Sequence, residues 1–306
     1  MKYFLGIDVG SSKTHALVVD EFGKCVGFGK AWGGNHQGVG YDGLANVLQE
    51  SFEQARGMAG VDASQIAGAG FGLAGYDFLS DREPHLQAVA ALGLNCPVEV
   101  VNDGVNGLLA GATRGIGVNV TAGSSNNCRG RNAAGKEGRI VGNGALFGEY
   151  GGAAEIIQRG LQMVNYAWIK RIPPTALTQI YLDATGAKDE LALMEGLSNQ
   201  QYHPYPFLAV DVIRAAREGD AAAREVIRWA GEELGWLAVS VARQIEMEND
   251  ADPMRAVVLQ HCPRAVLKRL DGPPVVGAVI LGMEQARFDG YAVRAEMIRT
   301  AKELVK

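Results

Sequence analysis

Ile7-Asp8-Val9-Gly10-Ser11-Ser12-Lys13-Thr14 places an acid, a glycine turn and three hydroxyl groups directly after an apolar strand. Residues 3–7 form that predicted strand, and residues 16–19 are its predicted hairpin partner. The turn between them can direct backbone N–H groups and hydroxyls at an anion. Asp8, at the strand end, can reach a magnesium ion through water. The stretch therefore indicates phosphate binding, although the same residues could form a simple hairpin turn.

A similar arrangement recurs in the middle of the chain. Residues 118–122 are a second apolar strand, which runs into Gly123-Ser124-Ser125 and then Asn126-Asn127-Cys128-Arg129. Two hairpins that each carry Gly-Ser-Ser predict two related lobes facing one ligand. Between them, the strand 98–102 delivers Asp103 at its carboxyl end, which is where open α/β sheets bind their ligands.

The composition fits a protein with two cores and disfavours several classes. The chain has 306 residues, more than one hydrophobic core usually organises. It carries 29 Lys and Arg against 34 Asp and Glu, a net charge of −5, without a basic run, so we expect no nucleic-acid partner. The longest apolar stretches, such as residues 275–283, are about half a membrane span, so we expect no membrane partner. Four scattered cysteines, without a C-x-x-C pair or a secretory leader, favour a cytoplasmic protein.

Other segments carry candidate site residues. The glycine-rich polar loop 31–40, which includes Asn35 and His36, is interpreted as a binding loop, although Asn35 could be only a turn residue. An amphipathic helix is predicted at 42–58. A strand-end carboxylate such as Asp103 can accept a proton late in phosphoryl transfer, or it could merely cap a helix at 105–112.

These motifs resemble the N-acetylglucosamine kinase and BadF/BadG ATPase family, within the actin, sugar kinase and Hsp70 superfamily. The resemblance weakens after about residue 155, and it rests on Gly6-Ile7-Asp8 with Lys13-Thr14, Asn35-His36, Gly72-Leu73-Ala74-Gly75, Asn102-Asp103 and Gly123-Ser124-Ser125-Asn126-Asn127-Cys128. It implies an α/β protein with a two-lobed actin-like ATPase fold, formed by duplicated ribonuclease H-like lobes with a helical insertion in the second. We predict a first lobe at 1–111, with a C-terminal helix at about 288–306 packing back on it, and a nucleotide-binding second lobe at 112–287.

The resemblance also implies transfer of the γ-phosphate of ATP to a hydroxyl of N-acetylglucosamine or a related amino sugar, with Mg²⁺ and with Asp103 as base. Asp8 would hold the magnesium through water. The implied ATP-binding residues are Asp8, Gly10, Ser11, Ser12, Lys13, Thr14, Gly123, Ser124 and Ser125. The implied substrate-binding residues are Asn35, His36, Gly75, Asn102, Asp103, Asn126, Asn143, Gly144 and Glu149. A small-molecule sugar and a second copy of the chain, in a homodimer, are the expected partners.

The chain departs from the family pattern at its second acidic motif. The kinases read approximately Gly-Asp-Glu-Gly-Ser there, whereas this chain has Glu149 at the Asp position and Tyr150 at the Glu position. Glu149 could accept hydrogen bonds from sugar hydroxyls, or it could cap the helix that begins near Gly151. The resemblance is therefore weakest on the identity of the sugar.

Two other functions stay open. One is an ATPase that drives conformational change, as in the BadF-type activators of dehydratases, although their cysteine-rich cluster loop is absent and Cys128 fits a small buried side chain better. The other is a non-catalytic sugar sensor, which the presence of Asp8 and Asp103 disfavours.

The C-terminal region contains an anomaly. Residues 254–259 predict a strand, which the family follows with an adenosine-binding loop, a helix and another strand. Here only residues 260–264 precede the apolar stretch 265–270, and a parallel crossover takes at least about 10–12 residues. Either the loop and helix are deleted, the strands pair differently, or residues are missing from the sequence. We favour the last explanation, which predicts a Cα–Cα separation far beyond 3.8 Å somewhere in 257–261.

Overall fold

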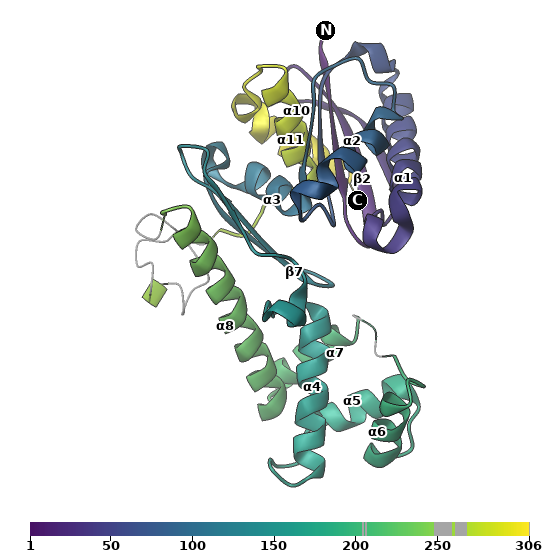
Figure 1. Cartoon of the computed structure of the whole chain (residues 1–306), viewed down its shortest axis with the longest axis vertical. Coiled ribbons are helices and arrows are strands. Elements are labelled where there is room, and N and C mark those ends of the chain that lie inside the picture. The colour runs from purple at the N-terminus through teal and green to yellow at the C-terminus, as the bar shows by residue number, and fades with distance from the viewer. Residues whose placement is uncertain (204, 206, 248–258, 261–267, 306) are drawn as a thin grey trace.

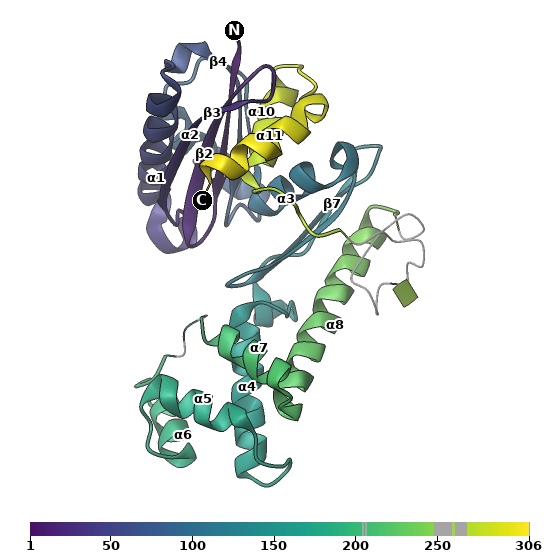
Figure 2. The same cartoon turned by 180° about the vertical axis from the view of Figure 1, so that it is seen from behind.

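The computed structural model describes residues 1–203, 205, 207–247, 259–260 and 268–305. The molecule is elongated, with an α/β unit at one end, a small sheet in the middle and a group of helices at the other end (Figure 1). The view from behind shows the same three parts (Figure 2). The predicted strand at 254–259 and the predicted break within 257–261 lie outside the described residues, apart from Leu259 and Gln260.

The α/β unit is built on a five-stranded sheet in the order β3-β2-β1-β4-β5. Its strands are β1 (Tyr3–Val9), β2 (Lys13–Asp20), β3 (Cys25–Trp32), β4 (Ile66–Leu73) and β5 (Val98–Asn102). The first three strands form the predicted antiparallel meander, and β1, β4 and β5 are parallel to one another. Val9 pairs with Leu73, and Leu73 pairs with Asn102, so three strands end side by side.

Helix α1 (His36–Ala59) covers one face of this sheet. Its buried residues Leu44, Leu48 and Phe52 join a core cluster with the strands. The prediction of a helix at 42–58 was correct in type but wrong in its start, because Asn35 caps the helix and Gly40, at φ 71°, kinks its first turns. Helix α2 (Arg82–Ala90) packs beside α1, and helix α3 (Asp103–Gly111) packs beside α10 (Val275–Gln285) instead. The short helices η1 (Ala63–Gln65) and η2 (Leu79–Asp81) precede β4 and α2.

Helices α10 (Val275–Gln285) and α11 (Gly290–Leu304) cover the other face (Figures 1 and 2). The backbone of α10 packs directly on β1 and β4, because a Cβ at Gly6 would lie 2.3 Å from the Val279 nitrogen and one at Gly70 would lie 2.1 Å from the Ala278 oxygen. The domain prediction placed 275–287 in the second lobe, and α10 corrects that assignment. The C-terminal helix packs on the first unit, where Thr300 Oγ1 accepts a 3.0 Å hydrogen bond from the Cys25 N–H.

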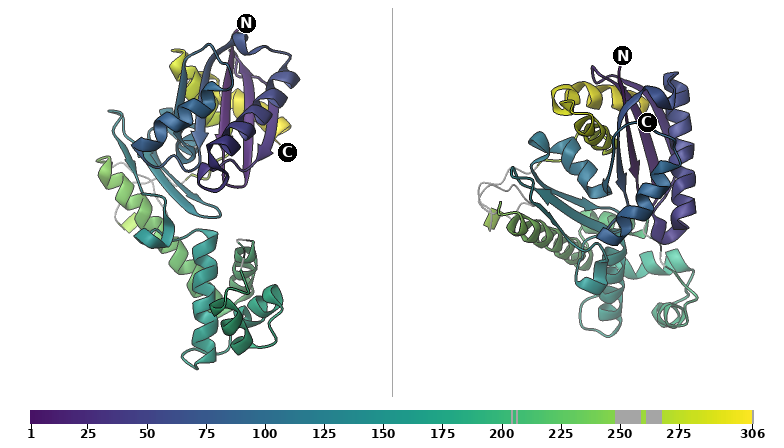
Figure 3. Two further views of the ribbon diagram at one scale, coloured as in Figure 1. Left: turned by 45° about the vertical axis from the view of Figure 1, so that its right-hand side comes forward. Right: turned by 45° about the horizontal axis from the view of Figure 1, so that its top comes forward.

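The middle of the molecule is the antiparallel sheet β6-β7-β8, formed by Gly117–Ala122, Asn126–Arg131 and Glu137–Arg139. It is the predicted second meander, and the short helices η3 (Thr113–Gly115) and η4 (Gly144–Phe147) flank it. Helix α8 (Ala221–Gln244) runs along it, as the turned view shows (Figure 3). Over the described residues this sheet has no parallel strands, so the feature that it shares with the five-stranded sheet is the antiparallel meander.

The far end of the molecule is helical, as predicted for residues 153–248. Helices α4 (Ala153–Trp168), α5 (Ala176–Thr185), α6 (Glu190–Ser198), α7 (Leu208–Glu218) and α8 share one buried cluster around Tyr181 and Val212. Asp220 caps α8 by accepting a hydrogen bond from the Ala223 N–H at 2.8 Å. Within the described ranges, every helix is too short or too polar to cross a membrane.

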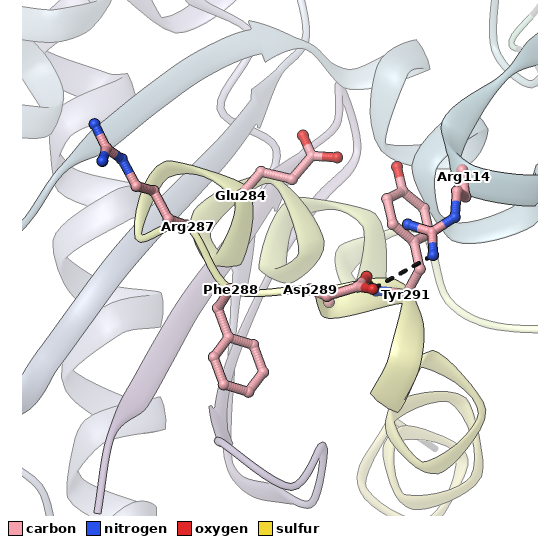
Figure 4. Close-up of a pocket in the computed structure, with 7 residues that line it drawn as sticks. Arg114, Glu284, Arg287, Phe288, Asp289 and Tyr291 are labelled. Carbon is pink, nitrogen blue, oxygen red and sulfur yellow. Dashed lines mark hydrogen bonds and ion pairs between the residues drawn. The ribbon is translucent and has the colours of Figure 1, made fainter. Parts of the chain in front are cut away.

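Ion pairs brace the junction between the α/β unit and the middle sheet. Arg131 on β7 lies 3.8 Å from Glu284 on α10, and Arg114 lies 3.5 Å from Asp289 before α11. Figure 4 shows a hollow at this junction, where the side chain of Arg287 points away from that of Arg114. The two guanidinium groups therefore do not converge on one ligand.

Candidate active site

Asp8 and Asn106 meet where the parallel strands end. Asn106, on α3, donates a hydrogen bond from Nδ2 to Asp8 Oδ1 at 2.7 Å. The absence of a side chain at Gly72 makes room for this contact, because a Cβ there would lie 1.9 Å from Asn106 Nδ2. Burial, assisted by the negative charge of Asp103, raises the pKa of Asp8 to about 7 against the opposing effects of Asn106 and Lys13. A bound cation would offset the free-energy cost of ionising Asp8.

Asp103 is the first residue of α3, and Asn102 is the cap of that helix. Asn102 Oδ1 accepts a hydrogen bond from the Gly104 N–H at 2.9 Å, and Asp103 Oδ1 shares the same donor at 2.9 Å. Burial raises the pKa of the Asp103 carboxyl to about 6, opposed mainly by the Gly104 hydrogen bond and the charge of Arg129. Asn102 is therefore the residue that caps α3, and the half-buried carboxylate of Asp103 is available for another role.

Strand β7 brings two more polar side chains to Asp103 from the middle sheet. Asn127 Nδ2 donates to Asn102 Oδ1 at 2.7 Å and to Asp103 Oδ1 at 3.2 Å. Arg129 forms an ion pair with Asp77 at 2.9 Å, in which both side chains are less than a tenth exposed. The sequence prediction assigned no role to Asp77, Asn127 or Arg129. The sequence signal that could have found them is the position of each, since Asp77 lies two residues after Gly75 and the other two flank Cys128.

The first Gly-Ser-Ser turn lies at the same end of the sheet. The Gly10 N–H donates to the Lys13 oxygen at 2.9 Å and closes the turn, which leaves Ser11, Ser12 and Lys13 exposed. The prediction that Thr14 contacts ATP is wrong, because its side chain is fully buried and its hydroxyl donates to the Trp32 oxygen at 2.8 Å. Side chains alternate between the two faces of a strand, and on β2 that of Thr14 points into the protein instead of towards the turn.

The predicted binding loop lies against this turn. Asn35 Nδ2 lies 3.4 Å from Ser11 Oγ, while its Oδ1 accepts a hydrogen bond from the Gln37 N–H at 2.9 Å. Gly75, at φ 84°, faces both Asn35 and His36, and a Cβ there would lie 2.5 Å from Asn35 Oδ1. His36 stacks on Tyr41 with a ring-centroid distance of 4.6 Å, and its buried Nδ1 has no hydrogen-bond partner. Asn35, His36 and Gly75 therefore share one corner of the site.

The second Gly-Ser-Ser turn abuts the start of α4. The oxygens of Gly123 and Ser124 accept hydrogen bonds from the N–H groups of Ala153 and Ala154, at 2.9 and 3.2 Å. The side chains of Ser124 and Ser125 are exposed. The turn is thus anchored through its backbone, which leaves both hydroxyls accessible to a ligand.

Glu149 organises the loop before it. Its carboxylate accepts hydrogen bonds from the N–H groups of Val141, Gly142 and Asn143 at 2.6, 2.8 and 3.0 Å. The alternative that Glu149 caps α4 is wrong, because Glu155 makes that bond, accepting from the Gly152 N–H at 2.8 Å.

The remaining predicted substrate residues surround the Glu149 loop. Asn126 is buried and donates from Nδ2 to the Glu149 oxygen at 2.8 Å. Its Oδ1 has no hydrogen-bond partner, and Gly144 takes a left-handed φ of 57°. Asn143 and Gly144 therefore lie in the loop that Glu149 holds together, and Asn126 on β7 contacts that loop through the Glu149 oxygen.

The donor set suits magnesium better than a transition metal. No group of three His, Cys, Asp or Glu side chains that could hold a metal occurs among the described residues. Mg²⁺ usually binds proteins through one or two carboxylates, with water and substrate phosphates completing its ligands, and Asp8 fits that pattern. Cys128 is fully buried in an apolar cluster, as predicted for a structural side chain.

The fold is that of structures assigned as candidate sugar kinases. A candidate N-acetylglucosamine kinase from Chromobacterium violaceum matches with a TM-score of 0.70 and 21% identity, over 92% of this chain and 99% of that one. Another from Porphyromonas gingivalis matches with a TM-score of 0.61 and 19% identity, over 91% and 98%.

The chain belongs to the BadF/BadG/BcrA/BcrD ATPase family, whose model matches residues 5–260. It is 26% identical over 251 residues to the N-acetylmuramic acid/N-acetylglucosamine kinase of Clostridium acetobutylicum, covering 81% of this chain and 82% of the relative. It is 23% identical over 316 aligned positions to the N-acetyl-D-glucosamine kinase of Dictyostelium discoideum, covering 93% and 98%.

Proposed function

We propose that this protein is an ATP-dependent kinase of N-acetylglucosamine or a related amino sugar, with Asp103 as the catalytic base. The observation that carries the proposal is that two half-buried carboxylates, Asp8 and Asp103, lie at the carboxyl ends of parallel strands, close enough that the charge of Asp103 raises the pKa of Asp8. One exposed Gly-Ser-Ser turn directly follows β1, and the other directly precedes β7. Membership of an ATPase family and likeness to two amino-sugar kinases support it.

In the proposed reaction a sugar hydroxyl attacks the γ-phosphorus of ATP. Its oxygen forms the new bond to phosphorus, the bond from the γ-phosphorus to the β–γ bridging oxygen breaks, and ADP leaves with the electron pair. The hydroxyl proton passes to Asp103, whose pKa is raised to about 6. This pKa is below neutral pH, so the carboxylate is ionised, and it is above the ordinary carboxyl value, so the carboxylate is a stronger base than usual. Mg²⁺ on Asp8 would neutralise charge on the phosphates.

The surrounding residues would bind the two substrates. The turn residues Gly10, Ser11, Ser12 and Lys13, with Gly123, Ser124 and Ser125, would hold phosphate oxygens through N–H groups, hydroxyls and one cation. Asn35, His36 and Gly75 would line the sugar side from the first unit, and the loop held by Glu149 would line it from the second. A homodimer, a cytoplasmic location and the lobe boundary near residue 111 remain part of this proposal.

A coupled assay of ADP release over a panel of sugars tests the proposal. The panel should include N-acetylglucosamine and N-acetylmuramic acid, and the variants should be Asp103→Asn and, as a matched acidic control, Asp42→Asn on the exposed side of α1. Sugar-dependent turnover that Asp103→Asn abolishes and Asp42→Asn keeps supports the kinase. Sugar-independent hydrolysis would favour an ATPase, and sugar binding without turnover would favour a sensor.

A further inference from the structure

The buried ion pair of Asp77 and Arg129 joins the two units beside Asp103. Asp77 lies in the loop after β4 of the first unit, and Arg129 lies on β7 of the second. Their side chains are 9% and 6% exposed, and the guanidinium Nη2 lies 2.9 Å from Asp77 Oδ1. Arg139 on β8 also donates to the Asp77 backbone oxygen. The middle sheet thus holds the Asp77 loop with two arginines.

Arg129 also contacts the two asparagines that surround Asp103. Its Nε donates to the Oδ1 atoms of Asn102 and Asn127, both at 3.1 Å. With its Oδ1 held by Arg129, Asn127 directs Nδ2 towards Asp103 Oδ1 at 3.2 Å. Gly104 makes room for this arrangement, because a Cβ there would lie 2.9 Å from Arg129 Cγ.

We infer that Arg129 is a positioning residue for phosphoryl transfer, which orients Asn127 and through its amide the carboxylate of Asp103, and which also holds the α3 cap Asn102. This inference rests on the proposed kinase function. Arg129 reaches the site from the second unit, so it also fixes that unit against the sugar side of the first. A simpler role would be to neutralise the buried Asp77 and nothing more, and the two roles predict different behaviour.

The charges around Asp103 provide the first measurement that distinguishes positioning of Asp103 from neutralisation of Asp77. Arg129 faces it from β7, Asp77 from the loop after β4, and Asp8 from β1. More remotely, Asp81, Arg139 and His36 act on Asp77, and Lys13 acts on Asp8. Loss of the Arg129 cation would leave Asp103 among carboxylates, which raises its pKa. The acid limb of kcat/KM should therefore move to higher pH in Arg129→Gln.

The kinetic test compares Arg129→Gln with Arg131→Gln. Arg131 is a matched control because it lies two residues away on β7 and also pairs across the units, with Glu284 on α10. We expect Arg129→Gln to lower kcat by about 100-fold, the effect of a small misplacement of reacting groups, with a smaller change in sugar KM. Arg131→Gln should keep the wild-type kcat and acid limb. Equal effects of the two variants on kcat and on the acid limb would overturn the inference.

The double variant Asp77→Asn/Arg129→Gln separates positioning from neutralisation, and it carries the test if Arg129→Gln alone does not fold. Removing both charges leaves no unpaired buried ion, so its melting temperature should exceed that of Arg129→Gln. Its kcat should stay low. Recovery of the wild-type kcat would show that Arg129 only neutralises Asp77, and would overturn the inference.

A crystal structure of the double variant gives a readout that does not depend on turnover. We expect the Asn127 amide to turn away from Asp103 once Arg129 no longer holds its oxygen. An Asn127 Nδ2 atom that stays within hydrogen-bond distance of Asp103 Oδ1 would contradict the inference. Absence of sugar-dependent turnover in the wild type would instead count against the proposed function.

Discussion

Asn106 Nδ2 donates a 2.7 Å hydrogen bond to Asp8 Oδ1, and this bond ties the end of β1 to α3. It is the direct protein partner of a carboxylate whose pKa is raised to about 7, chiefly by burial. Asp8 is thus held in place, while its ionisation has a free-energy cost in the unliganded protein. This combination is expected of a residue whose negative charge is balanced by a bound ligand.

The first prediction is that Asp8→Asn stabilises the protein at about pH 8 while abolishing turnover. The folded pKa, about 7, is above the ordinary value of 3.8, so the stability from the protonated form is complete below the ordinary value and is lost as pH rises through about 7. The rise in the pKa of Asp8 from 3.8 to about 7 limits the gain in the free energy of unfolding at about pH 8 to at most about 4 kcal/mol. Asn keeps an oxygen for Asn106 without the charge.

Thermal melts with and without magnesium measure this effect. The gain in melting temperature should shrink towards about pH 4, where both residues are neutral in the folded protein. Mg²⁺ with ATP should stabilise the wild type more than Asp8→Asn. A variant that is less stable than the wild type at about pH 8 would contradict the argument.

The second prediction concerns the pH dependence of catalysis. Asp103 accepts a proton only when it is ionised, and burial raises its pKa to about 6. The value of kcat/KM for the sugar should therefore rise with pH through about 6 and level off above it. A limb near the ordinary carboxyl value of 3.8 would show that the base is exposed, or that it is not Asp103.

The third prediction is that Glu149→Gln raises the sugar KM more than it changes kcat. Glutamine places an NH₂ group against the N–H groups of the loop 141–143, where the carboxylate now accepts three hydrogen bonds. The free energy of unfolding should fall by about 2 kcal/mol. Glu137→Gln, at an exposed position on β8, is the matched control and should change neither quantity. Unchanged sugar affinity in Glu149→Gln would separate this loop from the substrate site.

The fourth prediction tests the packing of α10 on the first unit. A Cβ at Gly70 would lie 2.1 Å from the Ala278 oxygen, so Gly70→Ala should lower the free energy of unfolding by about 1–3 kcal/mol or more. Gly57→Ala, on α1 with open space around it, should raise that free energy by about 0.5–1 kcal/mol. Urea denaturation compares the two. Similar effects in both variants would contradict the observed packing.

Local patterns predicted the two hairpins and the strand before Asp103, because apolar strands bounded by glycine turns need no distant information. The start of α1 was missed because three glycines between residues 38 and 43 hide its helical pattern, and because capping by Asn35 is visible only in three dimensions. Thr14 was misplaced since the hydroxyls of a turn and of the next strand look alike in sequence. Its direction depends on the register of β2 against β3.

The pairing of Asp77 with Arg129 could not be predicted from sequence, because the two residues are 52 positions apart and each only lies near a motif, without a pattern that links them. The position of α10 was also missed. Its contacts with β1 and β4 depend on glycines that read individually as turns or weak strand positions, and which together form a surface for a helix. Both the Asp77–Arg129 contact beside Asp103 and the packing of α10 in the core of the first unit thus depend on long-range packing, which has no local sequence signature.

The most direct test is to follow the phosphorus in a reaction of the wild-type protein with ATP, Mg²⁺ and N-acetylglucosamine or another sugar of the panel, by ³¹P NMR. We expect a sugar phosphomonoester to accumulate in step with ADP, and both signals to be absent with Asp103→Asn. Inorganic phosphate that forms at the same rate with and without sugar, without any sugar phosphate, would contradict the proposed kinase function.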